Sequence, residues 1–310
     1  MPELKPALYL VATPIGHLDD LSARARQVLA QADLVCAEDT RHYRHLLQAA
    51  QIQPGAQRLL SVHAHNEAAQ TDAVLQALGL GQRVAVVTDA GTPGIADPGQ
   101  RLVDAAWTHG YTVVPIPGAS AMAAAFSVCG FLPEDDRPWS FWGFLPARPH
   151  ERKKRLQAMR SVGGVCLAFE SPHRLEASLA DCIAVLGGAT PALLAKEMTK
   201  RFETLWRGPL TALYERRRAK TEEDPQAHKG EYVLVFAIPP RAAPAAAVLG
   251  LGESESTERV NDVNEAWQPW IDALAEVLPK AAAAKVIARA TGLTRQQAYA
   301  TLMRGNETEG

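Results

Sequence analysis

The segment TDAGTPGIADPG, residues 88–99, places three glycines and two prolines between an apolar run and a helical pattern. Glycine lets the backbone approach a ligand closely, and proline holds a loop in one shape. A simple tight turn needs fewer such residues, although an elaborate connection from strand to helix is the alternative interpretation. The composition of this segment therefore indicates a ligand-binding loop.

Two further loops of unusual composition accompany predicted strands of the same region. ATPIG, residues 12–16, follows the first strand, and PIPGASA, residues 115–121, comes at the end of the fifth. In open α/β sheets, ligands bind at the carboxyl ends of the strands. Three special loops at that edge predict a pocket. The chain lacks the GxGxxG, GxxxxGK[ST] and HExxH motifs, so nicotinamide, nucleotide-hydrolysis and metalloprotease functions have no support.

Short apolar runs alternate with amphipathic segments through the first 117 residues, which predicts a mostly parallel sheet with helices on its faces. The predicted strands are Ala7–Ala12, Leu34–Ala37, Leu59–His63, Val84–Thr88 and Val113–Ile116. A second α/β series has predicted strands at Trp139–Leu145, Gly164–Glu170, Ala192–Lys196, Glu203–Arg207 and Glu231–Ile238. Helices are expected near residues 150–160, 172–186 and 209–218.

These patterns divide the chain into four regions. We expect an α/β domain at residues 1–130, a second α/β domain at 131–238, a flexible linker at 239–265 and a small helical module at 266–310. The module is predicted to contain helices at Ala266–Leu278, Lys280–Ala290 and Thr294–Met303 and to resemble a helix-turn-helix. It would either contact nucleic acid or stabilise the protein by packing.

Composition restricts the class of protein further. The formal net charge of −2 gives no overall signal for nucleic acid, so an RNA surface would need local clusters of Arg and Lys. Four separated cysteines in apolar surroundings are expected to be reduced core residues, and no spacing of Cys or His predicts a metal site. Without a secretion signal or a membrane-spanning run, the protein is expected in the cytoplasm.

Eight segments occur in order and together resemble one known family. They are LYLVATPIGHLDDLSARA, AEDTR, VTDAGTPGIADPG, VVPIPGASA, FWGFLPARPHERKKRL, FESPHRL, AKEMTKRFETLWRG and KGEYVLV. In these segments the chain resembles the bacterial 16S ribosomal RNA cytidine-2′-O-methyltransferases, the ribosomal RNA branch of the tetrapyrrole methylases. The resemblance covers roughly residues 7–238.

The resemblance implies two α/β domains with S-adenosylmethionine (AdoMet) bound in the cleft between them. It also implies that the substrate is cytidine 1402 of 16S ribosomal RNA in the 30S subunit and that the enzyme is a homodimer. The implied cofactor contacts are Pro14, Asp89, Gly91, Thr92, Ile95, Ala96, Ser120, Ala121, Phe169, Ala195 and Gly230. Asp89 is equally compatible with capping the turn of its own loop.

Methyl transfer to a ribose hydroxyl requires a group that accepts its proton. Glu38 and Asp39 follow the second predicted strand and are the first candidates for this role. Glu170 and the Lys196–Glu197 pair come next. For each of these residues, an ion pair or a helix cap that organises the cleft is the alternative role.

RNA affinity depends on the neutralisation of phosphates by Lys and Arg. The run RPHERKKRL provides several basic side chains, although such runs often form only a solvated helix face. The candidate RNA-binding residues are Arg41, Arg148, Arg152, Lys153, Lys154, Arg174, Lys200 and Arg201. Two other functions remain open at this level: a tetrapyrrole C-methyltransferase of the same fold and a non-catalytic AdoMet-binding protein.

Overall fold

The first sheet of the computed structural model consists of five parallel strands in the order β3-β2-β4-β1-β5. The structure describes residues 4–132, 138–223, 229–239 and 278–291, with a few positions between 294 and 302. The strands are β1 (Ala7–Val11), β2 (Leu34–Ala37), β3 (Arg58–Ser61), β4 (Arg83–Val87) and β5 (Val113–Ile116). The prediction of a parallel first sheet is confirmed, with strand ends within two residues of those expected.

Helices cover both faces of this sheet because the side chains of its strands alternate between two cores. Along β1, Tyr9 and Val11 enter one core and Leu8 enters the other. The first core receives α1 (Ala23–Gln31) and α2 (Thr40–Ala49), and the second receives α3 (Glu67–Gly79) and α4 (Gln100–Thr108). A 3₁₀ helix, η1 (Leu18–Asp20), precedes α1.

The strand order creates a topological switch point between β1 and β4. These two strands are neighbours, but the chain leaves β1 toward β2 on one side and leaves β4 toward β5 on the other. The loops at residues 12–16 and 88–99 therefore begin side by side at the carboxyl edge and lead the chain in opposite directions. Open α/β sheets bind ligands at such a point. Thr13 and Gly91 link the two loops by reciprocal backbone hydrogen bonds of 2.9 and 3.1 Å.

The second sheet is mixed, with the order β6-β7-β10-β8-β9. Only β6 and β7 are parallel to each other, and the remaining neighbours are antiparallel. Its strands are β6 (Trp139–Phe144), β7 (Gly164–Glu170), β8 (Pro191–Lys196), β9 (Thr204–Pro209) and β10 (Tyr232–Ile238). The helices between them are α6 (Pro149–Val162), α7 (Leu175–Leu186) and α8 (Leu210–Glu223).

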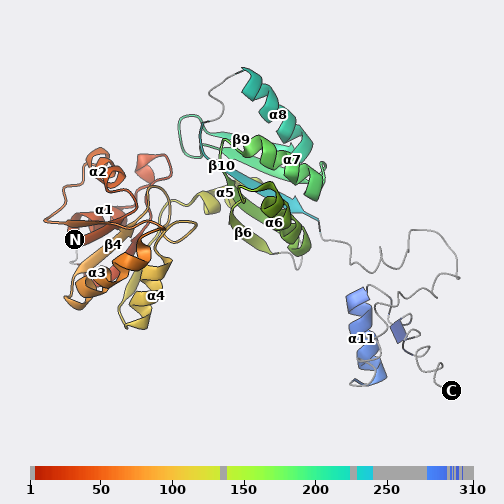
Figure 1. Cartoon of the computed structure of the whole chain (residues 1–310), viewed down its shortest axis with the longest axis horizontal. Helices are drawn as coiled ribbons and strands as arrows, with labels where there is room; N and C mark the ends of the chain where they lie inside the picture. Colours follow the sequence, from red (N-terminus) through yellow and green to blue (C-terminus); the bar gives the residue numbers. More distant parts are fainter. Residues whose placement is uncertain are drawn as a thin grey trace. The chain divides into compact units, whose positions relative to one another are not determined.

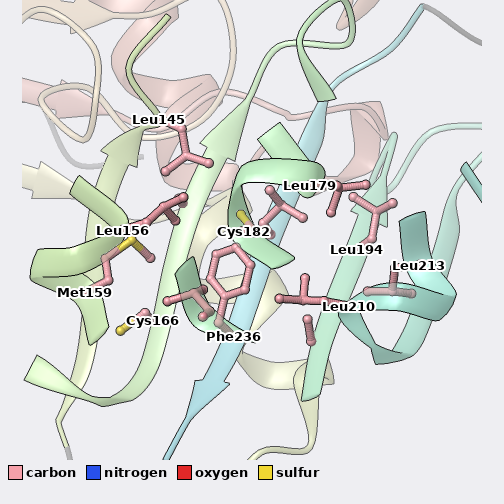
Figure 2. Close-up of a cluster of buried hydrophobic side chains, with 14 of the residues drawn as sticks. Leu145, Leu156, Met159, Cys166, Leu179, Cys182, Leu194, Leu210, Leu213 and Phe236 are labelled. Atoms are coloured by element: carbon pink, nitrogen blue, oxygen red, sulfur yellow. The ribbon is translucent and has the colours of Figure 1, made fainter. Parts of the chain in front are cut away.

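The central strand β10 shows why both faces of the second sheet are covered. Tyr232, Leu234 and Phe236 point into a core with α6, α7 and α8, whereas Val233 and Val235 point into the opposite core. Figure 2 shows the first of these cores, with Phe236 at its centre, and Figure 1 shows α7 and α8 beside the sheet.

The opposite face is covered by α5 (Ala121–Cys129), which lies between the two sheets in the sequence. Ala125 and Cys129 of α5 pack against residues of β7, β8 and β10. The helix that follows the first sheet thus contributes to the core of the second sheet. The predicted boundary at residue 130 and the other domain limits stay predictions.

The described part of the C-terminal region contains α11 (Lys280–Thr291), in agreement with the helix predicted at Lys280–Ala290. Ala283, Ala284 and Ile287 pack with Ala298 and Leu302 in a small core. The predicted helix Ala266–Leu278, except for its last residue, and nearly all of the predicted linker lie outside the described residues. None of the described helices is both long and apolar enough to cross a membrane.

Candidate functional site

The three loops predicted from the sequence line one cavity of about 420 Å³, which we call the first cavity. Its wall also includes Glu38, Phe144 of β6, residues of β7 and β10, and the segments that follow β7 and precede β10. The lining residues are Ile15, Glu38, Asp89, Ala90, Gly91, Thr92, Ile95, Ala96, Asp97, Ser120, Ala121, Phe144, Phe169, Glu170, Ser171, Pro172, Gly230, Glu231, Tyr232 and Val233. Its size is in the range of small-molecule and cofactor sites.

The loop at residues 88–99 has an unusual backbone where it borders the first cavity. Gly91 has φ +85° and Ala96 has φ +66°, although alanine rarely adopts left-handed values. At Ala96 this backbone strain costs about 1–3 kcal/mol, and such a conformation persists only where the surroundings enforce it. Thr92 donates from Oγ1 to the carbonyl of Ala119 at 3.1 Å, which joins this loop to the one at 115–121.

A buried carboxylate binds the C-terminal end of the same loop by hydrogen bonds. Glu67, at the start of α3, accepts hydrogen bonds from the backbone amides of Gly99 and Arg101, both at 2.9 Å. These amides belong to the first turn of α4, where backbone donors otherwise lack partners. Glu67 therefore anchors the end of the loop to α3.

The first cavity is strongly anionic. Five carboxylates line it, and no Lys, Arg or His is among its described lining residues. One of them, Glu170, accepts from Arg174 at 3.0 Å and also from Ser178, so its charge is largely compensated. The other four are Glu38, Asp89, Asp97 and Glu231, of which Asp89 also contacts His42 and Glu231 also contacts Lys200 in the second cavity. Such a cavity favours a ligand with positive charge.

Two of these acids hold their protons more tightly than usual. Burial and the nearby charges of Glu38, Asp89 and Glu231 raise the pKa of Asp97 to about 7. Burial also raises the pKa of Glu38, and the charge of Asp89 adds to this effect. The cavity thus accumulates negative charge at an energetic cost that a bound cation would reduce.

We expect Asp97 to make stability depend on pH. Between its ordinary pKa of 3.8 and about 7, the folded protein binds more protons than the unfolded chain, so stability falls as pH rises. Asp97→Asn should have the wild-type melting temperature at pH values below this window and exceed it at pH values above. Thermal unfolding across the window checks this, and a difference that is independent of pH would contradict it.

A second cavity of about 390 Å³ adjoins the first. The two cavities share Ile15, Glu38, Asp89, Ala90 and Glu231 as lining residues. The other lining residues of the second cavity are Thr13, Pro14, Gly16, Leu18, Ala37, Asp39, His42, Tyr43, Leu46, Ala49, Val87, Thr88 and Lys200. The arrangement provides two adjacent binding volumes with a common wall.

One side of the second cavity depends on close approach at Gly16. A Cβ atom at this position would lie 2.5 Å from Cγ of Lys200 and 3.0 Å from its backbone nitrogen. The Thr199 hydroxyl also accepts from the His17 amide at 3.1 Å. The loop that follows β1 therefore contacts the segment between β8 and β9.

Sequence and structure comparisons agree with this architecture. Residues 7–214 match the family of tetrapyrrole (corrin/porphyrin) methylases. Ribosomal RNA small subunit methyltransferase I of Mesorhizobium japonicum is 39% identical over 307 residues, which are 99% of this chain and 95% of the relative. The protein of the same name from Pseudomonas aeruginosa is 44% identical over 230 residues, 74% of this chain and 78% of the relative. The chain belongs to the ribosomal RNA small subunit methyltransferase I family.

The fold of this family member is also found in solved structures of other methylases. Uroporphyrin-III C-methyl transferase from Thermus thermophilus, complexed with S-adenyl homocysteine, matches with a TM-score of 0.51 and 15% identity. The match covers 75% of this chain and 98% of that one. This likeness establishes the tetrapyrrole-methylase fold, as the sequence predicted.

Most of the predicted cofactor residues of this family member lie together. The first cavity is lined by Asp89, Gly91, Thr92, Ile95, Ala96, Ser120, Ala121, Phe169 and Gly230. Pro14 lines the second cavity instead, and Ala195 of β8 is fully buried. Ala195 lines neither cavity, and its side chain packs in the core that β8 shares with α5.

The two predicted catalytic residues have different surroundings. Asp39 is the N-cap of α2, accepts from the Arg41 amide at 2.7 Å and forms an ion pair with the Arg41 guanidinium. These hydrogen bonds hold the pKa of Asp39 far below its usual range. Glu38 lies in the wall common to both cavities, where its Oε2 accepts from the Asp89 amide at 3.4 Å. The structure thus gives Asp39 the alternative, capping role, and the catalytic role of Glu38 stays a prediction.

The prediction that Arg152 binds RNA is wrong. Its side chain is 3% exposed and forms an ion pair with Asp181 at 2.6 Å. It also donates to the carbonyls of Pro146 and Ala147, which places it inside the protein rather than on a surface. Lys153 also reaches Asp181, at 3.4 Å, but half of its side chain is exposed.

The other candidate RNA residues differ in their availability. Arg174 pairs with Glu170, and Lys200 pairs with Glu197 and Glu231 at 3.0 and 3.1 Å. The exposed candidates are Arg41, Arg148, Lys154 and Arg201. Of these, Lys154 and Arg201 form no ion pair with the described residues.

Sequence reasoning missed four residues that organise the site: His42, Glu67, Asp97 and Glu231. Asp97 lies within the segment TDAGTPGIADPG, so its position in a ligand loop was a usable signal. His42 directly follows AEDTR, but only the start of α2 brings it to Asp89. Glu231 lies in the segment KGEYVLV beside the predicted Gly230, which was also a usable signal, whereas Glu67 gave none because its importance depends on contacts with the distant start of α4.

Proposed function

We propose that this protein transfers a methyl group from AdoMet to the ribose 2′-hydroxyl of a cytidine in small-subunit ribosomal RNA. The observation that supports the donor most strongly is the anionic first cavity at the switch point of the sheet. The names of the relatives support ribosomal RNA of the small subunit as the substrate. The cytidine and the 2′-oxygen rest on the sequence motifs.

The residues of the first cavity fit AdoMet chemically. The donor contains a positively charged sulfonium, an ammonium group, a ribose and an adenine ring. Carboxylates of Glu38, Asp89, Asp97 and Glu231 suit the positive charges, and apolar side chains such as Phe169 suit the adenine. The positive φ of Gly91 keeps a backbone turn at the cavity without a side chain.

When bound, AdoMet supplies an electrophilic methyl group on its sulfonium sulfur. The protein's own contribution is to position the reacting groups and exclude water, which is a large part of catalysis for a displacement reaction. The shared wall of Ile15, Glu38, Asp89, Ala90 and Glu231 allows a ligand in one cavity to meet a ligand in the other. We therefore assign the second cavity to the acceptor nucleoside.

The exposed basic residues of α6 and its flank are proposed to bind RNA phosphates. Arg148→Glu combined with Lys154→Glu should lower affinity for small ribosomal subunits by at least ~10-fold and reduce the salt dependence of binding. AdoMet affinity should not change, since neither residue lines the first cavity. Filter binding at several salt concentrations measures the first effect and calorimetry the second.

The matched control reverses two exposed cations elsewhere, Lys5→Glu with Arg24→Glu, which change the net charge equally. These variants should bind subunits almost as well as the wild type. An equal loss in both pairs would mean that net charge alone is responsible and would contradict the assigned surface. We leave Lys153 unchanged because its reversal would place two acids together at Asp181.

We also propose that the protein is a homodimer in the cytoplasm. Large apolar side chains are exposed near the end of α5 and the start of β6: Val128, Leu132 and Trp139 are 45%, 84% and 46% exposed. Contiguous exposed apolar patches often mark surfaces of protein–protein contact. Sedimentation equilibrium should give twice the mass of the chain, and a monomer at micromolar concentration would contradict the proposal.

The function is tested with AdoMet that has a labelled methyl group. Purified protein should transfer label to small ribosomal subunits that lack this modification, and not to precorrin-type tetrapyrroles. Label in the tetrapyrrole would favour the C-methyltransferase alternative. AdoMet binding without transfer to either acceptor would favour the non-catalytic alternative.

A further inference from the structure

A histidine and an aspartate form a close pair at the junction of the two cavities. Nδ1 of His42 lies 2.9 Å from Oδ2 of Asp89. The other oxygen of Asp89, Oδ1, accepts from the Asp39 amide at 3.2 Å, which fixes the carboxylate. His42 lines the second cavity, and Asp89 lines both.

This contact determines which nitrogen of the neutral ring can accept a proton. The carboxylate can only accept, so Nδ1 carries the hydrogen and donates it to Asp89. Nε2 is then the basic nitrogen, and no described residue hydrogen-bonds to it. The side chain is 65% exposed, so an acceptor in the second cavity and solvent can both reach it.

The other titratable groups of the second cavity are less suited to accept a proton. Asp39 is paired with Arg41, and Lys200 is held by Glu197 and Glu231. Tyr43 donates to Gln57 and burial raises its pKa to about 12. Glu38 is half-buried in the anionic wall, where its charge favours a cationic donor.

We propose that His42 accepts the proton of the 2′-hydroxyl and that Asp89 orients its ring. This inference rests on the proposed function. The O–H bond of the ribose breaks and its proton forms a bond with Nε2, while the oxygen forms a bond with the methyl carbon. The carbon–sulfur bond of the donor breaks and its electron pair stays on sulfur. The imidazolium then releases the proton to solvent.

The charges around His42 give the proposal a characteristic pH dependence. Asp89 is the main cause of a raised pKa at His42, Asp39 adds to it, and Arg41 opposes it. The same cavity contains Glu38, Lys200 and Glu231. A raised pKa means that the ring is protonated at low pH, so the rate should rise as pH increases through a value above 6.5.

The test uses single-turnover methyl transfer to small subunits with His42→Asn, which keeps a side-chain donor toward Asp89. The rate constant should fall by about 10²–10⁴-fold, the usual contribution of a general base. The rate constant should also lose its rise with pH. The dissociation constant for AdoMet should stay within about 3-fold of the wild-type value by calorimetry, which is equivalent to a change in binding free energy of roughly 0.6 kcal/mol. His45→Asn, an exposed histidine of the same helix, is the matched control and should keep the wild-type rate.

A second measurement needs no donor or RNA. NMR of the imidazole groups in the free protein should show the Nδ1–H form of His42 and a pKa above 6.5, and Asp89→Asn should lower that pKa. In the transfer assay, Asp89→Asn should move the rise in rate to lower pH. A role of His42 in structure alone would leave the pH profile unmoved.

The outcomes separate this inference from the proposed function. Transfer by the wild type together with an unchanged rate or an unchanged pH profile in His42→Asn overturns the role of His42 and leaves the function standing. A wild-type protein that transfers no methyl group to the subunit overturns both. A large loss of rate with the pH rise removed, and with donor binding retained, supports the assignment.

Discussion

Gly91→Val should reduce AdoMet affinity by at least ~100-fold, equivalent to about 2.7 kcal/mol. Gly91 has φ +85°, a conformation that valine adopts only with strain, and its side chain would project at the wall of the first cavity. Its backbone also exchanges hydrogen bonds with Thr13, so a shift there would displace residues 12–16 as well. Isothermal titration calorimetry with AdoMet measures the loss.

Gly110→Val is the matched control for this prediction. Gly110 has φ +75°, but no atom lies within 4 Å of an added Cβ and the residue lines neither cavity. Its replacement should lower the unfolding free energy by about 1–3 kcal/mol and leave AdoMet affinity unchanged. If both variants lost AdoMet affinity equally, backbone strain in general would explain the result and the proposed site would be contradicted.

Removal of two carboxylates should weaken AdoMet binding more than the binding of S-adenosylhomocysteine. Glu38→Gln with Asp97→Asn takes two acids from the wall of the first cavity. At separations of about 5 Å and an effective dielectric constant near 20, an ion pair is worth on the order of 3 kcal/mol. We expect the preference for the sulfonium compound over the neutral thioether to fall by about 10-fold or more.

Competition binding with both ligands measures this preference. The control, Asp72→Asn with Asp104→Asn, removes two exposed acids from α3 and α4, away from either cavity. It should preserve the wild-type ratio. A wild-type ratio in the cavity variant would contradict the assignment of the anionic wall to the sulfonium.

The parts of the site that depend on local sequence were predictable. The loops at residues 12–16, 88–99 and 115–121 follow strands, so parallel pairing brings them to one edge of the sheet. Asp97 shares the second of these loops, yet its pKa is raised by burial and by nearby acids, of which Glu38 and Glu231 come from other segments and Asp89 from the same loop. The sequence identifies the loop residues, but the electrostatic environment of each residue depends on the fold.

The misplaced residues had surroundings that their own segments do not reveal. Arg152 lies in a basic run, but it faces inward because Asp181 of α7 reaches its guanidinium. Ala195 is in the expected strand but is fully buried in the α5 core, whereas its cross-strand partner Val233 in the same core lines the first cavity. His42 lies three residues after the predicted Asp39; its ring pairs with Asp89, whereas the carboxylate of Asp39 pairs with Arg41.

The central claim is that the methyl group is transferred to the 2′-oxygen of a cytidine, and one analysis of the labelled product tests it directly. Alkali cleaves RNA through free 2′-hydroxyl groups, so a 2′-O-methylated nucleotide remains in an alkali-resistant dinucleotide. We predict that the label from AdoMet is found in such a dinucleotide and, after complete digestion, in 2′-O-methylcytidine. Label in alkali-sensitive mononucleotides, which would place the methyl group on a base, would contradict the account.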